Sequence, residues 1–369
     1  MNRKTIISGK IGQLLIVGFD GTEMSPRLRS LLTRVQPGGV ILFARNITSG
    51  EQTHRLLKEC QSYVSTRLFT CVDMEGGRVD RFRNVIGAAP SAADVFAAGN
   101  RALFRKHGQT IGECCRTLGC NTDFAPVVDL AFEASRKVMS SRSVSADPKE
   151  ATVYAREFLA GLRSASVLGA IKHFPGLGEA NLDTHHELPK VEKSLKKLWE
   201  ADIAPYRALR RETPMILVSH AAYPAVTRDH RPASLSRKWI TDILRKKIGY
   251  RGLVVSDDLE MGGVLQAAPI EQAAVEHIRA GGDLCLICHS EEPILRSFEA
   301  VVKAVESDAK FARRAEESIT RLLAFKKNSK ELKPPAPAPT AAKLGRLSRQ
   351  LWEFSEQVRL ATIRRQDLA

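Results

Sequence analysis

The chain has 369 residues, of which 43% are hydrophobic and 26% are charged, so a sizeable core can form and disorder of the whole chain is excluded. No apolar run approaches the roughly 20 residues of a membrane-spanning helix, and residues 1–10 do not form a secretory signal. The net charge of +15 suggests an anionic partner, but +6 of it lies in the last 44 residues and no basic recognition helix stands out. We therefore predict a cytoplasmic protein with no membrane span and no nucleic-acid partner.

Short apolar runs recur along the chain, and longer amphipathic stretches lie between them. The runs are nearly continuous rather than alternating, which is typical of parallel strands covered on both faces. The predicted strands are residues 12–19, 38–43, 68–73, 122–127, 169–174, 215–220, 253–257 and 284–288. The predicted helices include 51–65, 148–163, 194–211 and 236–248, with starts at Asp147, Ser194 and Ser234 or Ser236.

This alternation over about 300 residues predicts an α/β fold of the (β/α)8 TIM-barrel type, with a doubly wound open sheet as the alternative. Polar residues follow most of the runs, which favours the barrel because barrel enzymes carry their chemistry at that rim. We predict a single catalytic domain over 1–327, a Pro/Ala-rich linker over 328–343 and a basic amphipathic tail over 344–369. A poorly ordered or self-docking tail is favoured over one that binds a partner or an anionic membrane.

The seven cysteines are an odd number in a chain without an export signal, which predicts reduced thiols. Cys285, Cys288 and His289 match the C-x-x-C-H pattern of haem c attachment. The surrounding residues are apolar, however, so we predict a buried strand here instead of a haem site.

The segment 172–189 has the richest catalytic potential. A strand ends at His173, a Pro-Gly-Leu-Gly turn follows, and a polar loop carries Asp183 and His185. A turn could let this carboxylate hydrogen-bond the imidazole, which fixes the tautomer and suits general acid–base catalysis. A metal site with His173, Asp183, His185 and His186 as ligands is the alternative, but the spacing fits no standard zinc pattern.

Two other strand ends carry candidate residues. The run 253–257 leads directly into Asp257 and Asp258, and a carboxylate at the barrel mouth can act as a nucleophile. Successive strand residues point to opposite faces, so we assign the chemistry to Asp257 and a capping role to Asp258. Asp73 and Arg81 flank a Gly-Gly turn, and their acceptors and donors suit a polyhydroxylated ligand.

These stretches, in this order, resemble glycoside hydrolase family 3, and specifically its single-domain bacterial β-N-acetylhexosaminidases of the NagZ type. The family pattern K-H-F-P-G-H-G-x4-D-S/T-H corresponds to residues 172–185, and D-x-E-G-G-R-V-x-R-F corresponds to residues 73–82. Residues 121–129 and 256–259 also match, and the likeness runs from about 11 to 325. One departure is Leu177, which stands where the family pattern has histidine and puts loop closure or substrate preference in doubt.

The resemblance implies a retaining, two-step mechanism. Asp257 corresponds to the nucleophile that forms a glycosyl-enzyme, His185 to the acid/base, and Asp183 to the residue that orients it. The implied sugar contacts are Asp73, Arg81, Arg142, Lys172 and His173.

The implied substrate is a terminal β-linked N-acetylglucosamine on a muropeptide or anhydro-muropeptide in peptidoglycan recycling, with no metal or organic cofactor, and we expect a monomer. A β-glycoside phosphorylase is an alternative, because a histidine tolerates an attacking phosphate better than a carboxylate would. Another family 3 β-glycosidase is a further alternative. An inactive sugar-binding protein is the last, suggested by Leu177 and the basic tail.

Overall fold

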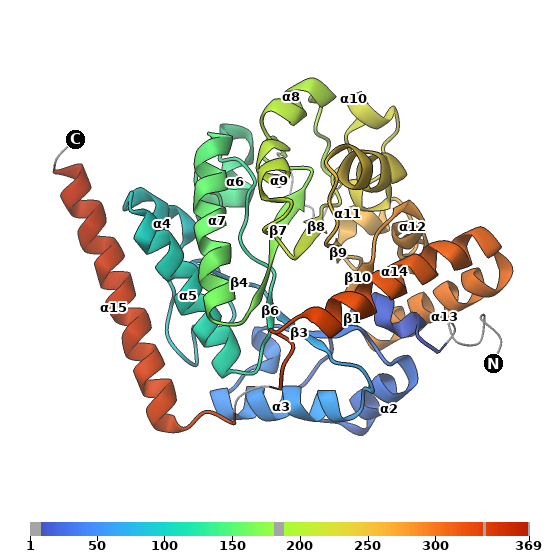
Figure 1. The fold of residues 1–369 in the computed structure, drawn as a ribbon, viewed down its shortest axis with the longest axis horizontal. Coiled ribbons are helices and arrows are strands. Elements are labelled where there is room, and N and C mark those ends of the chain that lie inside the picture. Colours follow the sequence, from blue (N-terminus) through green and yellow to red (C-terminus); the bar gives the residue numbers. More distant parts are fainter. Residues whose placement is uncertain (1–8, 181–187, 335–336, 368–369) are drawn as a thin grey trace.

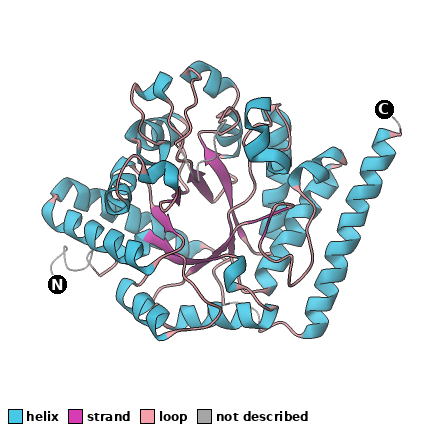
Figure 2. Cartoon of the chain, turned by 180° about the vertical axis from the view of Figure 1, so that it is seen from behind, coloured by secondary structure: helices cyan, strands magenta, loops and turns pink. Residues whose placement is uncertain are grey.

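The computed structural model describes residues 9–180, 188–334 and 337–367. Parallel strands close into a barrel in the order β1-β10-β9-β8-β7-β6-β3-β2, and helices enclose it (Figure 2). The predicted (β/α)8 barrel is therefore confirmed, and the open-sheet alternative is wrong. The barrel strands are β1 (Leu15–Val17), β2 (Gly39–Leu42), β3 (Phe69–Val72), β6 (Thr122–Asp123), β7 (Leu168–Phe174), β8 (Met215–Val218), β9 (Leu253–Asp258) and β10 (Leu284–Ile287).

A small antiparallel hairpin follows β3, and helices of varied length connect the remaining strands (Figure 1). The hairpin strands are β4 (Met74–Gly76) and β5 (Val79–Asp80). The α-helices are α2 (Pro26–Val35), α3 (Gly50–Ser62), α4 (Ala92–Ala97), α5 (Arg101–Thr117), α6 (Arg136–Met139), α7 (Pro148–Ser164), α8 (Leu195–Glu200), α9 (Ala204–Leu209), α10 (Pro224–Thr227), α11 (Gly262–Leu265), α12 (Ile270–Ala280), α13 (Glu291–Ser307), α14 (Ala309–Asn328) and α15 (Ala341–Gln366). The 3-10 helices are η1 (Ile11–Leu14), η2 (Ala44–Asn46), η3 (Glu133–Ser135), η4 (Ser140–Arg142) and η5 (Ala233–Leu235), and η6 (Lys238–Lys247) is a π-helix.

Each predicted strand overlaps a barrel strand, but several boundaries are wrong. Residues 12–14 belong to η1, and only Thr122–Asp123 of the predicted strand 122–127 forms a barrel strand. The predicted helix 194–211 is two helices, α8 and α9, because Pro205 has no N–H to donate and cannot sit inside a continuous helix. Asp147 and Ser194 do cap helices, since their side chains accept hydrogen bonds from the backbone N–H groups of Lys149 and Lys197.

The barrel interior is packed with side chains from the strands, including Ile16, Ile41, Phe69 and Leu217. All seven cysteines are buried and unbridged. The C-x-x-C pair lies in and just after β10, so the prediction of a buried strand is confirmed.

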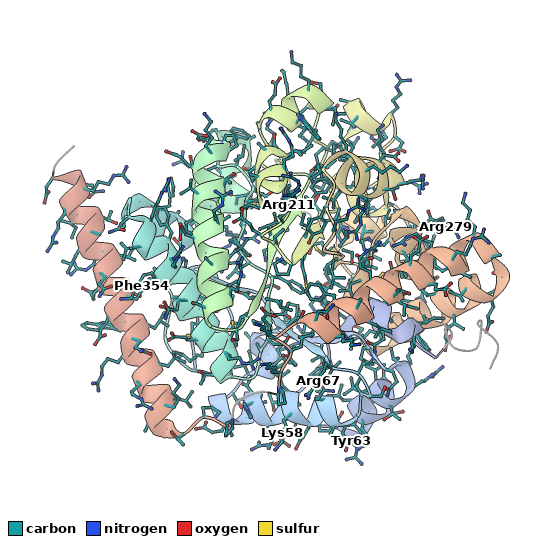
Figure 3. All side chains as sticks on the ribbon, in the orientation of Figure 1. Lys58, Tyr63, Arg67, Arg211, Arg279 and Phe354 are labelled. Atoms are coloured by element: carbon teal, nitrogen blue, oxygen red, sulfur yellow. The ribbon has the colours of Figure 1, made fainter. Side chains whose placement is uncertain are left out.

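The C-terminal segment ends in α15, which lies against α4 and α5 on the outside of the barrel (Figures 1 and 3). The apolar face that α15 buries consists of Leu347, Leu351, Phe354 and Val358. Its opposite face leaves Trp352 exposed. No helix among residues 9–180, 188–334 and 337–367 is long and apolar enough to cross a membrane.

Candidate active site

A cavity of about 140 Å³ opens at the carboxyl ends of the barrel strands. It brings together the predicted nucleophile and all the predicted sugar contacts, which are Asp257, Asp73, Arg81, Arg142, Lys172 and His173. The predicted acid/base His185 and its partner Asp183 lie outside the described residues, as does His186. The described part of the site therefore contains one candidate nucleophile and a wall of charged side chains.

Asp257 lies near the end of β9, and its Oδ1 accepts a hydrogen bond of 2.9 Å from the backbone N–H of Asp258. Burial alone would raise the pKa of Asp257. His173, His220, the Asp258 N–H and Lys172 outweigh that effect, so the pKa lies below its ordinary value. The carboxyl group is consequently ionised at neutral pH, which is the form a nucleophile requires.

The neighbouring carboxylate of Asp258 has a different role. Its Oδ1 accepts hydrogen bonds from the backbone N–H groups of Glu260, at 3.0 Å, and Cys288, at 3.2 Å. Its Oδ2 lies 3.1 Å from Nε2 of His289. Asp258 thus ties the end of β9 to the turn that follows it and to the end of β10.

Lys172 and Arg142 are held in the cavity wall by two carboxylates. Nζ of Lys172 lies 2.7 Å from Asp73 and 2.6 Å from Glu75. Arg142 donates two parallel hydrogen bonds of 2.8 Å to Glu75. Burial opposes both ionised states of the Lys172–Glu75 pair, yet the opposite charges prevail, so the pKa of Lys172 is raised and that of Glu75 lies far below its ordinary value. The wall therefore stays charged and fixed in position.

His173 is oriented by Asp129. The Asp129 carboxylate accepts hydrogen bonds from the backbone N–H of His173 (3.1 Å), from its Nδ1 (2.7 Å) and from the backbone N–H of Leu177 (2.7 Å). Because an ionised carboxylate only accepts, Nδ1 carries the proton and Nε2 remains for a ligand. The side chain of Leu177, which is only 4% exposed, forms an apolar part of the cavity wall where the family pattern has histidine.

Arg81 lies at the edge of the cavity beside an aromatic ring. Its guanidinium carbon is 5.4 Å from the centre of the Phe43 ring. Its Nε is buried, and no residue in the described part of the chain accepts a hydrogen bond from it. The Nε–H group of Arg81 is therefore a hydrogen-bond donor that a bound ligand can satisfy.

Sequence reasoning gave no role to three buried residues of the site, Glu75, Asp129 and His220. Glu75 and Asp129 lie in the matching motifs 73–82 and 121–129, and His220 is the last residue of the predicted strand 215–220. These positions were the available sequence signal for the three residues. His220 is buried, and its Nδ1 is 2.7 Å from Oγ of Ser234 and its Nε2 is 2.8 Å from the carbonyl oxygen of Asp258, the residue after Asp257. Burial lowers the pKa of His220. Within the described residues, no group of three or more His, Cys, Asp and Glu side chains could hold a metal ion.

The glycosyl hydrolase family 3 N-terminal domain profile matches residues 6–325. The chain belongs to glycoside hydrolase family 3. A Beta-hexosaminidase of Alkalilimnicola ehrlichii is 36% identical over 287 residues, which is 76% of this chain and 82% of the relative. One from Idiomarina loihiensis is 31% identical and covers 80% of this chain and 89% of the relative.

Solved structures match most of the length of this chain. A β-N-acetylglucosaminidase from Paenibacillus sp. str. FPU-7 has a TM-score of 0.86 and 31% identity, and the match covers 96% of this chain and 69% of that one. A β-N-acetylhexosaminidase from Beutenbergia cavernae has a TM-score of 0.80 and 25% identity, with 87% of this chain and 98% of that one covered. The cavity in this family 3 chain thus lies at the barrel end where enzymes of this fold carry out catalysis.

Proposed function

We propose that this family 3 glycoside hydrolase is a retaining exo-β-N-acetylglucosaminidase that removes terminal non-reducing β-linked N-acetylglucosamine. The observation that carries the proposal is the ionised Asp257 carboxylate, which lines a cavity at the carboxyl end of the barrel together with Lys172 and Arg142. The names of the curated relatives and of the structural neighbours support the choice of a β-linked hexosamine.

In the first step, Asp257 attacks the anomeric carbon. The bond from that carbon to the leaving oxygen breaks, and His185 gives its proton to that oxygen. In the second step, His185 removes a proton from water, which attacks the anomeric carbon and releases the carboxylate. Two displacements restore the β configuration.

A histidine as acid/base has an electrostatic consequence. Most retaining glycosidases place two carboxyl groups about 5–5.5 Å apart. An imidazole in place of one of them removes a negative charge that would oppose ionisation of Asp257. We assign to Asp183 the role of orienting His185.

The sugar contacts follow from the wall of the cavity. Asp73 has acceptor oxygens for hydroxyl groups, and Lys172, Arg142 and Arg81 have donors. His173 presents Nε2, because Asp129 fixes its other nitrogen. These residues hold the sugar ring in reach of Asp257.

We infer further that the natural substrates are muropeptides or anhydro-muropeptides and that the enzyme acts in cytoplasmic peptidoglycan recycling, as a monomer and without a cofactor. The family resemblance supports this finer assignment. A comparison of turnover on purified anhydro-muropeptides with turnover on chitobiose tests it, and a preference for chitobiose would contradict it.

The test of the activity is a panel of chromogenic β-N-acetylglucosaminide, β-glucoside and β-xyloside substrates. We expect hydrolysis of the first, and we expect Asp257→Ala to lower kcat by about 10⁴-fold or more. Asp242→Ala, which removes a carboxylate paired with Lys246 on η6, is the matched control and should leave kcat unchanged. Near-normal turnover by Asp257→Ala would reject the proposal, and formation of sugar 1-phosphate in phosphate buffer would favour the phosphorylase alternative.

A further inference from the structure

A larger cavity, of about 730 Å³, lies at the opposite end of the barrel. It is bounded by α3, by the entrance to β3 and, between α14 and α15, by residues 332–334 and 337–338. Parallel strands begin at the same end of a barrel, so this cleft is remote from Asp257 and takes no part in the proposed hydrolysis.

The cleft has fixed walls. Arg116 on α5 donates hydrogen bonds to the backbone carbonyl oxygens of Glu331 (2.8 Å), Lys333 (3.4 Å) and Pro334 (3.4 Å). Leu332, between them, is 4% exposed and packs in the cluster that fills the barrel interior. Residues 331–334 are therefore attached to the barrel on one side of the cleft, and α3 forms the other side.

The inside of the cleft is apolar. Leu57, Leu68 and Leu332 line it. The polar side chains of its floor are already engaged, because Thr70 Oγ1 donates to the carbonyl oxygen of Gly119 at 2.9 Å and Asn121 Nδ2 donates to that of Leu68 at 3.0 Å. The interior therefore favours an apolar group over a polar one.

The rim of the cleft is cationic. Arg55, Lys58, Arg67 and Lys333 line it, and among the described lining residues Glu51 carries the single carboxylate. Within the described part of the chain, Arg55, Lys58 and Arg67 form no ion pair. Figure 3 shows Lys58 and Arg67 together on the α3 side of the molecule. Cations grouped around an apolar interior attract an anion that carries an apolar body.

We propose that this cleft binds a soluble amphiphilic anion. The head group, a carboxylate, sulfonate or phosphate, lies among Lys58, Arg67 and the other rim cations, and the apolar chain or ring lies against the exposed apolar residues of the lining, Pro334, Pro337 and Ala338. The volume falls within the roughly 300–1,000 Å³ of small-molecule sites. A head group of this kind accepts hydrogen bonds from both Lys and Arg.

Isothermal titration of the full chain with decyl phosphate, below its micelle concentration, tests the proposal. We expect saturable binding of one molecule per chain. Inorganic phosphate lacks the apolar body and decyltrimethylammonium has the opposite charge, so each should bind at least about tenfold more weakly. Equal affinity for the three probes, or binding to anionic vesicles without binding of decyl phosphate, would overturn the proposal.

Reversing the charges of two rim residues tests whether the ligand binds in this cleft. The double variant Lys58→Glu/Arg67→Glu should bind decyl phosphate at least about tenfold more weakly. The matched control Lys196→Glu/Arg211→Glu reverses two exposed charges that do not line the cleft and should bind as the wild type does. Figure 3 shows Arg211 away from Lys58 and Arg67. Equal weakening in both double variants would show a nonspecific charge effect and sink the proposal. The readout is heat of binding, so failure of the proposed glycosidase activity would leave this result unchanged.

Discussion

Two buried lysines, one at each end of the barrel, show how the same side chain is used in opposite ways. Lys172 lies between the carboxylates of Asp73 and Glu75, and its pKa is raised. Lys326 donates to Oε1 of Gln13 and to the carbonyl oxygen of Gly38, and it lies over the ring of Phe69. Its neighbours are mostly neutral, so burial lowers its pKa to about 7.

Burial alone therefore does not decide whether a lysine side chain is charged. At the carboxyl end, opposite charges compensate for lost solvation and keep the wall charged for a sugar. At the amino end, the neutral dipoles around Lys326 compensate only in part for its lost solvation, so its ammonium group releases a proton more readily than an exposed lysine does. Substitutions at the two ends of the barrel should therefore have different effects on stability.

The largest effect is expected from Glu75→Gln, because it leaves Arg142 and Lys172 buried with one fewer carboxylate. Loss of one partner of a buried ion pair costs about 3–5 kcal/mol, so we expect a fall of that size in the free energy of unfolding at pH 7, measured by urea denaturation. Because the folded pKa of Glu75 lies below its ordinary 4.5, this stabilisation is present above about pH 4.5 and is lost as the pH falls below it.

Glu299→Gln is the matched control, since Glu299 forms an exposed ion pair with Arg34. Its effect should be below about 1 kcal/mol. If the two variants were equally stable, the charged wall would not be the stabilising element described here.

A smaller loss is expected from Asp129→Asn. The amide cannot accept all the hydrogen bonds that reach the carboxylate from the His173 ring, the His173 N–H and the Leu177 N–H. We expect a loss of about 1–3 kcal/mol in unfolding free energy and about a tenfold fall in kcat/KM for a β-N-acetylglucosaminide. Unchanged kinetics would mean that His173 does not need Asp129 for its orientation.

The smallest expected effect is that of Lys326 on the pH dependence of the free energy of unfolding. The folded pKa of Lys326, about 7, lies below its ordinary 10.5, so at this residue the unfolded chain binds more protons between these values, and the contribution of Lys326 to the free energy of unfolding should rise with pH across that window. Lys326→Met should lack that rise. Lys327→Met changes the next, exposed lysine and should keep it. Identical slopes in the two variants would refute the assignment, as measured by denaturation from pH 7 to pH 10.

The fold was predictable because parallel strands covered on both faces leave apolar runs in the sequence. Boundaries were less predictable, as Pro205 shows: the amphipathic pattern of 194–211 continues through it although the backbone cannot. Much of the site was predictable because the residues that follow barrel strands meet at one rim.

Other parts of the site depend on contacts between distant segments. Glu75 and Arg142 are 67 positions apart, and no local pattern indicates that they pair. The cleft at the amino end forms between residues 51–70 and residues 332–334 and 337–338, so neither part of the chain alone indicates it. Such features follow from packing and not from periodicity.

The central claim is that Asp257 forms a covalent bond to the sugar. Incubation with a slowly hydrolysed 5-fluoro analogue of a β-N-acetylglucosaminide, followed by peptide mass spectrometry, tests it most directly. The account predicts one added glycosyl group per chain, on Asp257, and no labelling of Asp257→Ala. A label on Asp73, Glu75 or another carboxylate, or rapid turnover with no adduct in quenched samples, would contradict it.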